Sequence, residues 1–173
     1  MATRRRILLA PGASGNPKQL GPHALGLRER GYEVEIVSLP KGTVERAMPV
    51  YRGAIGADPS TVVTGGQSFG GRVATLLAAV DPPAALVLFA YPLHAPGRHD
   101  AWRERTSHWP QISCPVLLLS GESDPFARID LLREAVNQLP AATLTTYPGV
   151  GHGVGPVLDE ALDEVDGFLR ANT

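Results

Sequence analysis

The fold is decided by residues 61–71, which read TVVTGGQSFGG and contain the motif Gly66-x-Ser68-x-Gly70. A short apolar run precedes the motif, and an apolar helical pattern follows it. A serine on a tight strand-to-helix turn takes a strained backbone conformation, and side chains on its neighbours would collide unless these are glycines. Such a turn raises the hydroxyl above the sheet and directs the amino terminus of the helix at developing negative charge. The motif predicts Ser68 as a nucleophile; the alternative is an ordinary glycine-rich turn, since the pentapeptide also occurs by chance.

Six short apolar runs are typical of strands that helices cover on both faces. They are residues 7–10, 34–37, 61–64, 85–89, 116–120 and 143–147. Because helical patterns alternate with these runs, we expect parallel strands joined by right-handed crossovers. The predicted fold class is therefore α/β, a doubly wound and mainly parallel sheet of about six strands with helices on both faces. In such sheets ligands bind at the carboxyl ends of the strands, so the loops after the strands are where function is expected.

Three helices are marked by their ends or by their apolar faces. Asn16 can cap a helix that has Pro17 at its first position and ends at Gly31. Residues 70–80 are apolar on nearly every side, so we expect this helix to be the most buried. Pro156 opens a last helix with apolar residues at core-facing spacing.

Bulk composition describes one ordinary globular domain, residues 1–173. Hydrophobic residues make up 43% of the chain and charged residues 19%. The formal net charge of −1 gives no electrostatic reason to expect a nucleic-acid partner. Cys114 is the single cysteine, which excludes an internal disulfide and suits a reducing compartment.

The amino terminus has a basic run followed by apolar residues, as a secretion signal does, but the apolar run is short. The basic run Arg4-Arg5-Arg6 is followed by four apolar residues before Pro11 and Gly12 interrupt them. This is shorter than the roughly 7–15 residues that the core of a signal peptide needs. No stretch approaches the ~20 apolar residues of a membrane span. The sequence predicts a cytoplasmic protein without a membrane partner.

A base and an acid follow the serine in the chain, as nucleophilic catalysis by a hydroxyl requires. Asp124 follows the fifth predicted strand and His152 lies in a glycine-rich turn after the sixth, so the order is serine, acid, histidine. We predict His152 as the base and Asp124 as the acid that orients it. Asp124 has the alternative of capping the next helix, and Glu122 is a rival acid in the same loop.

The chain resembles the α/β-hydrolases over nearly its whole length. Within them it is similar to a small capless group related to dienelactone hydrolases, which includes a testis-expressed-protein branch and a subunit of a chromatin-associated complex. The resemblance rests on residues 9–13, 65–71, 91–97 and 121–126. It implies a compact fold with no lid domain. The chain departs from the family in lacking the antiparallel strands that usually precede residue 7 and in reading PGASG at residues 11–15, where a His-Gly loop is common.

The resemblance also implies a mechanism. His152 would take the proton of Ser68, which attacks an ester-like carbonyl, and backbone N–H groups of Ala13 and Phe69 would hold the oxyanion. Water would then release the acyl-enzyme, with a small molecule as the substrate and no metal or other cofactor. Two alternatives stay open: a hydrolase fold kept as a protein-interaction module, and a hydrolase of a thioester, lactone or peptide bond. No oligomeric state is predicted.

Three further residues are predicted to contact the substrate. Gln67 precedes the serine, where the similar group often has arginine, so any pocket charge there is lost. Tyr91 and His94 follow the end of the fourth strand and are expected either to line the pocket or to have a structural role in their loop.

Two other patterns favour ordinary structure over a bound group. Residues 12–16 imitate a dinucleotide-binding turn, but the third glycine and the ribose-binding acid are absent. The remaining histidines (His23, His94, His99 and His108) fit no metal-ligand spacing. Residues 98–108 are charged, with Trp102 inside the segment and Trp109 directly after it. This is typical of a solvated helix whose tryptophans seal the core, the alternative being part of the rim of the site.

Overall fold

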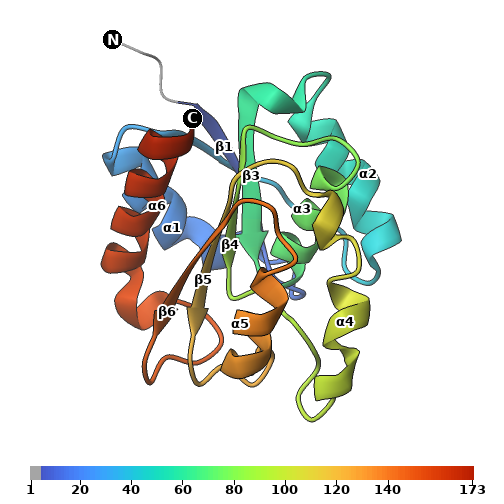
Figure 1. Cartoon of the computed structure of the whole chain (residues 1–173). Coiled ribbons are helices and arrows are strands. Elements are labelled where there is room, and N and C mark those ends of the chain that lie inside the picture. Colours follow the sequence, from blue (N-terminus) through green and yellow to red (C-terminus); the bar gives the residue numbers. More distant parts are fainter. Residues whose placement is uncertain (1–4) are drawn as a thin grey trace.

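A single sheet of six parallel strands runs through the protein, which a computed structural model describes over residues 5–173 (Figure 1). Arg4 of the basic run, and the rest of residues 1–4, lie outside the described residues. The strands are β1 Arg6–Ala10, β2 Glu33–Ile36, β3 Val62–Gln67, β4 Ala85–Phe89, β5 Val116–Gly121 and β6 Ala142–Tyr147. Their order is β2-β1-β3-β4-β5-β6, and every neighbouring pair is parallel. This confirms the predicted doubly wound sheet.

Helices cover both faces of the sheet, as the alternating pattern predicted. One face carries α1 (Gly21–Glu29) and α6 (Leu158–Asn172), whose apolar side chains pack in one core cluster. The other carries α2 (Val44–Ile55), α3 (Phe69–Ala78), α4 (Trp102–Arg105) and α5 (Ile129–Val136) around a second cluster. In Figure 1 α1 and α6 lie to the left of the sheet, and α2 and α3 lie to its right. Within residues 5–173, no helix combines the length and the apolar character needed to cross a bilayer.

The chain reverses its direction of travel across the sheet between β1 and β3. From β1 it goes to β2 at one edge, returns to β3 beside β1, and then proceeds outward through β4, β5 and β6. The carboxyl ends of β1 and β3 therefore meet where connections leave toward opposite faces. This is the position at which open α/β sheets bind their ligands.

Helix starts differ from the sequence prediction in detail. The Asn16 side chain accepts the Lys18 N–H at 3.1 Å, but it caps a 3₁₀ turn over Pro17–Leu20, and α1 begins only at Gly21. Pro156 likewise lies in the 3₁₀ turn Gly155–Val157, and α6 begins at Leu158. Proline satisfies the first turn of either helix type, since its fixed φ suits both and it has no N–H to pair.

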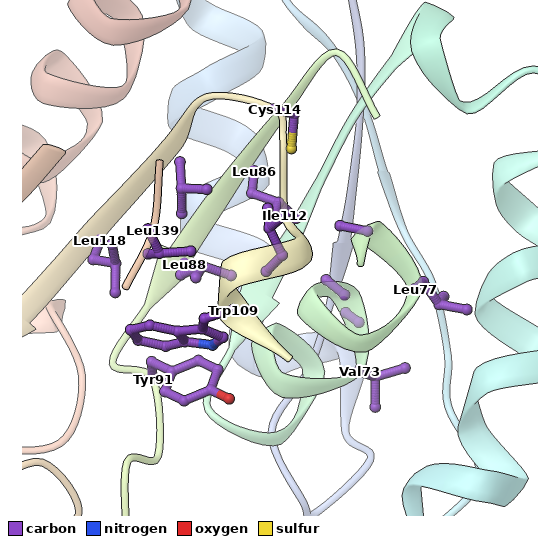
Figure 2. Close-up of a cluster of buried hydrophobic side chains, with 14 of the residues drawn as sticks. Val73, Leu77, Leu86, Leu88, Tyr91, Trp109, Ile112, Cys114, Leu118 and Leu139 are labelled. Atoms are coloured by element: carbon purple, nitrogen blue, oxygen red, sulfur yellow. The ribbon is translucent and has the colours of Figure 1, made fainter. Parts of the chain in front are cut away.

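Two tryptophans close the core around the short helix α4. Trp109 has no exposed surface, and its ring meets the Tyr91 ring edge-on with centroids 5.0 Å apart. Figure 2 shows the two rings as neighbours. Trp102 is also buried. The predicted sealing role of the tryptophans is confirmed, although the helix expected in residues 98–108 is only four residues long.

Replacing Trp109 tests how much this packing contributes. We expect Trp109→Ala to lower the free energy of unfolding by about 3–5 kcal/mol, because it leaves a cavity under β4 that the strands cannot fill. Urea unfolding followed by circular dichroism measures the change. The control is Val80→Ala, at a side chain that is 71% exposed, for which we expect a change within about 0.5 kcal/mol. Equal effects of the two substitutions would contradict this account of the core.

Candidate active site

Ser68 sits on a strained turn between β3 and α3. Its φ of 50° and ψ of −117° place it in the left-handed half of backbone space, which residues other than glycine seldom occupy. The Ser68 N–H donates to the carbonyl of Phe89 on the neighbouring strand at 2.9 Å, and this bond anchors the turn. A Cβ on Gly66 or on Gly70 would overlap the carbonyl oxygen of Ala10 at the end of β1. The two glycines of the motif are therefore required by the close approach of β1.

A continuous chain of contacts joins Ser68, His152 and Asp124. The Nε2 atom of His152 lies 2.9 Å from Ser68 Oγ, and its Nδ1 atom lies 2.8 Å from Asp124 Oδ2. The Asp124 side chain is fully buried, whereas the His152 side chain is 24% exposed. The other oxygen of Asp124 accepts the Phe126 N–H at 2.8 Å. Both oxygens of the buried carboxylate are thus occupied, and the histidine is held between acid and hydroxyl.

Loops after adjacent strands hold Asp124 and His152 in this arrangement. The loop after β5 is tied to the loop after β6 because the Ser123 N–H donates to the Val150 carbonyl at 2.9 Å. Gly121 allows this contact, since a Cβ there would overlap the carbonyl of Val150. The ring of Phe126 lies against the His152 imidazole, with centroids 4.5 Å apart. The imidazole plane is therefore set by packing as well as by its polar partners.

The rival carboxylate, Glu122, is engaged elsewhere. Its Oε1 atom accepts the Thr146 hydroxyl at 2.7 Å and lies 3.3 Å from an Arg133 guanidinium nitrogen. The alternative expectation for Asp124, that it caps the next helix, describes only a local turn, because α5 begins at Ile129. Of the two acids in this loop, Asp124 is the one that contacts His152.

The two predicted oxyanion donors lie on either side of Ser68. Phe69 is the first residue of α3, so helix geometry leaves its N–H without a partner in the helix. Ala13 follows Gly12, and a Cβ on Gly12 would lie 3.8 Å from Ser68 Cβ. Neither N–H is donated to a backbone carbonyl within residues 5–173. Both groups are therefore free to donate to a bound oxygen.

A cavity of about 390 Å³ opens beside His152. Its lining is partly polar and partly apolar: Gln19, His23, Gln67, His152, Gly153, Val154, Gly155 and Pro156. Gln67 was predicted to contact the substrate, and the structure places it at this cavity. The cavity is where a substrate bound next to Ser68 has room.

Tyr91 and His94 do not line this cavity. The Tyr91 hydroxyl donates to the Arg105 carbonyl at 3.0 Å, and its ring is in the core against Trp109. His94 has no exposed surface; its Nδ1 atom lies 2.9 Å from the Ala95 carbonyl and its Nε2 atom accepts the Arg128 N–H at 3.0 Å. Their polar groups are satisfied by protein, so the structural loop role, rather than substrate contact, describes their positions.

His23 lines this cavity, whereas the sequence favoured a solvated or packing role for it. Its side chain is buried, and neither ring nitrogen has a hydrogen-bond partner among the described residues. It meets Phe89 edge-on with centroids 4.9 Å apart. Burial lowers the pKa of His23 to about 4, so the ring is neutral at neutral pH. The sequence holds one signal for the burial of His23, which is its place on the same helix as the buried Ala24 and Leu27. Among residues 5–173, no group of three or more histidine, cysteine, aspartate or glutamate side chains is arranged to hold a metal ion.

Comparison with known proteins identifies the class. Residues 43–164 match the family described as the alpha/beta hydrolase domain, so this chain belongs to the α/β-hydrolases. The structure of a monoacylglycerol lipase from Paleococcus ferrophilus superimposes with a TM-score of 0.84 at 17% identity, covering 99% of this chain and 96% of that one. Butyrate-bound esterase 2 of Thermogutta terrifontis superimposes with a TM-score of 0.76 at 18% identity, covering 97% and 83%.

The sequence relatives are longer proteins. An uncharacterised protein of Mycobacterium tuberculosis, represented in two strains, is 35% identical over 130 residues. The match covers 65% of this chain and 46% of the relative, so the chain spans about half the length of the curated relatives it matches. The fold and the family are thereby established, and the particular activity is a matter for proposal.

The strain at Ser68 predicts that this residue costs stability. We expect Ser68→Gly to be more stable than Ser68→Ala by about 1 kcal/mol, because glycine adopts the left-handed conformation freely and alanine does not. Both variants lose the contact with His152, so their difference isolates the Cβ. Urea unfolding of the two proteins side by side measures it. If the alanine variant proves as stable as the glycine variant, the turn is not strained.

Proposed function

We propose that this chain is a serine hydrolase that cleaves small ester-like substrates through Ser68, His152 and Asp124. The observation that carries the proposal is the position of His152, 2.9 Å from the Ser68 hydroxyl on one side and 2.8 Å from a buried carboxylate on the other. Serine is a poor nucleophile unless a base accepts its proton, and imidazole is such a base when an acid orients it. In this proposal residues 1–173 act as one cytoplasmic domain.

The proposed reaction has two halves. His152 Nε2 takes the proton of Ser68 as Oγ bonds to the carbonyl carbon, and the N–H groups of Phe69 and Ala13 stabilise the oxyanion. The imidazolium then gives its proton to the leaving alcohol, and an acyl-enzyme results. Water repeats the sequence, with His152 again as the base, and releases the acid and free Ser68. Asp124 stays ionised and stabilises the imidazolium in both halves.

Small substrates are favoured by the surroundings of Ser68. The cavity beside His152 is about 390 Å³ and mixes amide side chains such as Gln67 with Val154 and Pro156. Residues 91–114, where a cap would be inserted, form the core contacts of Tyr91 and Trp109 and the four-residue helix α4. That segment leaves no chain for a covered apolar tunnel. We place the chain with the capless group related to dienelactone hydrolases for the same reason. We favour an ester over a lactone or peptide bond because esterase and lipase structures are among its structural neighbours, and a thioester stays the alternative because a thioesterase domain is among them too.

Labelling with a fluorophosphonate probe tests the proposed nucleophile. We expect one adduct, on Ser68, that is absent in Ser68→Ala and strongly reduced in His152→Ala, because the probe reacts with an activated hydroxyl next to an oxyanion site. Intact-protein and peptide mass spectrometry locate the adduct. Asp124→Asn is expected to lower the labelling rate by up to about 10⁴-fold, since it favours the wrong tautomer of His152.

The matched control for the acid is Glu122→Gln, which alters a carboxylate of the same loop that does not contact His152. We expect its effect to be small. A folded wild-type protein that does not react, or that reacts at Ser14, Ser120 or Ser123, would overturn the hydrolase proposal and favour an interaction module. A larger loss in Glu122→Gln than in Asp124→Asn would transfer the acid role to Glu122.

The shallow site predicts a preference for short acyl groups. We expect specificity constants on p-nitrophenyl esters to peak between acetate and butyrate and to decline with longer chains, because an open cavity buries few methylenes and each adds about 0.8 kcal/mol only while it is buried. The measurement is a chain-length series below the micelle concentration. Activity that climbs steadily to octanoate would reveal an apolar tunnel and refute this account of residues 91–114.

A further inference from the structure

A second hollow, of about 320 Å³, lies between α3 and α4 and is lined mainly by arginine. Its lining residues are Arg72, Ala95, Arg98, Ala101, Glu104 and Arg105. Three guanidinium groups and one carboxylate give the lining an excess of positive charge. The two alanines are small, so the charged groups surround open space rather than filling it.

Two of these arginines have no acidic partner. Within residues 5–173, no hydrogen bond or ion pair reaches the guanidinium of Arg72. Arg105 donates to the Pro92 carbonyl at 3.0 Å and makes no ion pair. Both side chains are half-buried. Burial first, and then the positive charge of Arg72, lower the pKa of Arg105, so the two groups lie close enough to repel each other.

The carboxylates near the hollow do not neutralise it. Glu104 acts on Arg105 only through space, without an ion pair. Glu45 on α2 is exposed and likewise feels the charge of Arg72 only at long range. Asp100 lies 3.9 Å from Arg98, with both side chains largely in solvent, where such a pair stabilises little. His108, which the charge of Arg72 also reaches, is neutral at neutral pH because burial lowers its pKa to about 4.

The other half-buried arginines of residues 5–173 are paired with acids, Arg6 with Glu35 and Arg30 with Asp159 and Asp163. The further arginines without an acidic partner in these residues (Arg5, Arg28, Arg46 and Arg52) are exposed to solvent. Among the described residues, Arg72 and Arg105 are therefore the half-buried arginines that lack an acid, and they share one hollow. Desolvated like charges that are held together without a counter-charge are the arrangement that binds carboxylate or phosphate, which guanidinium contacts in bidentate fashion.

The hollow is within reach of the proposed nucleophile. Arg72 lies one turn along α3 from Ser68, and its N–H donates to the Ser68 carbonyl at 3.1 Å. Four residues of α-helix advance about 6 Å, so the Arg72 backbone is roughly that far along the axis from Ser68. Phe69, Arg72 and Leu76 form the half-buried stripe of α3, so the Arg72 side chain lies on the same face as that of Phe69, the residue directly after Ser68.

We propose that Arg72 and Arg105 bind an anionic group of the ester that Ser68 cleaves, so that the preferred substrates carry a carboxylate or a phosphate a few bonds from the scissile carbonyl. This inference rests on the proposed function and names its substrate class. It assigns recognition to Arg72 and Arg105 and chemistry to Ser68 and His152. Gln67, which is neutral, plays no part in it.

The test compares two methyl esters of the same length that differ in one end group, monomethyl glutarate with a carboxylate and methyl pentanoate with a methyl, and methanol release is followed by proton NMR. We expect wild-type kcat/KM to be at least tenfold higher for the anionic ester. In Arg72→Gln the ratio of the two specificity constants is expected to fall about tenfold or more through KM, as loss of a charged hydrogen bond predicts. Arg105→Gln is expected to act in the same direction. The matched control, Arg103→Gln, removes an exposed arginine that pairs with Glu134, and the ratio should not change.

Binding measured without catalysis separates this inference from the proposed function. Calorimetric titration of Ser68→Ala with glutarate and with inorganic phosphate should show an anion site. Adding Arg72→Gln should weaken binding at this site at least tenfold. Arg72→Lys, which keeps the charge, replaces Arg72→Gln in this titration if the glutamine variant does not fold. Arg72-dependent binding in a protein that the fluorophosphonate does not label would uphold the anion site and refute the hydrolase. Ester cleavage with no charge preference and no Arg72-dependent binding would overturn the inference alone. Arg72-dependent binding of phosphate that leaves the two esters equally good would overturn the substrate assignment and indicate a site for a free anion.

Discussion

The close approach of β1 to the turn at Ser68 is the constraint on which the site depends. The Ala10 carbonyl lies where a Cβ of Gly66 or Gly70 would be, so the turn closes only with glycine at both positions. Ser68, between the two glycines, takes a left-handed conformation that strains its backbone. The result is that the hydroxyl points away from the sheet at the start of α3, where unpaired N–H groups are available.

Everything else at the site is arranged by strand order. β5 and β6 are neighbours in the sheet, and their following loops are joined through Ser123 and Val150, so Asp124 and His152 meet although 28 residues separate them. The buried carboxylate has one oxygen on His152 and the other on the Phe126 N–H. A carboxylate this deeply buried needs hydrogen-bond partners, and the loops after β5 and β6 each supply one.

The helix α3, which begins directly after Ser68, also carries Arg72 to the arginine-lined hollow. The spacing between Ser68 and Arg72 along the chain is therefore fixed by α3, whereas Arg105 reaches the hollow from α4. Residues 91–114 close the hollow from the other side, and their tryptophans and Tyr91 anchor that segment to the core. This short segment therefore both completes the apolar core and lines the hollow.

The sequence by itself determined the class of fold, because parallel strands that are buried on both faces appear in a sequence as continuous apolar runs. The glycines around Ser68 added a second signal, since a tight strand-to-helix turn has no room for side chains at those positions. The sequence also determined the chain order of Ser68, Asp124 and His152. The sequence does not mark the helices α2 and α5 clearly, since Pro49 interrupts the helical pattern of α2 and α5 is only eight residues long. Only the tertiary structure decided that Asp124 rather than Glu122 contacts His152, that Tyr91 and His94 face protein, and that His23 and Arg72 border cavities. Each of these depends on which loops lie side by side across the sheet, and residue spacing along one chain carries no information on that.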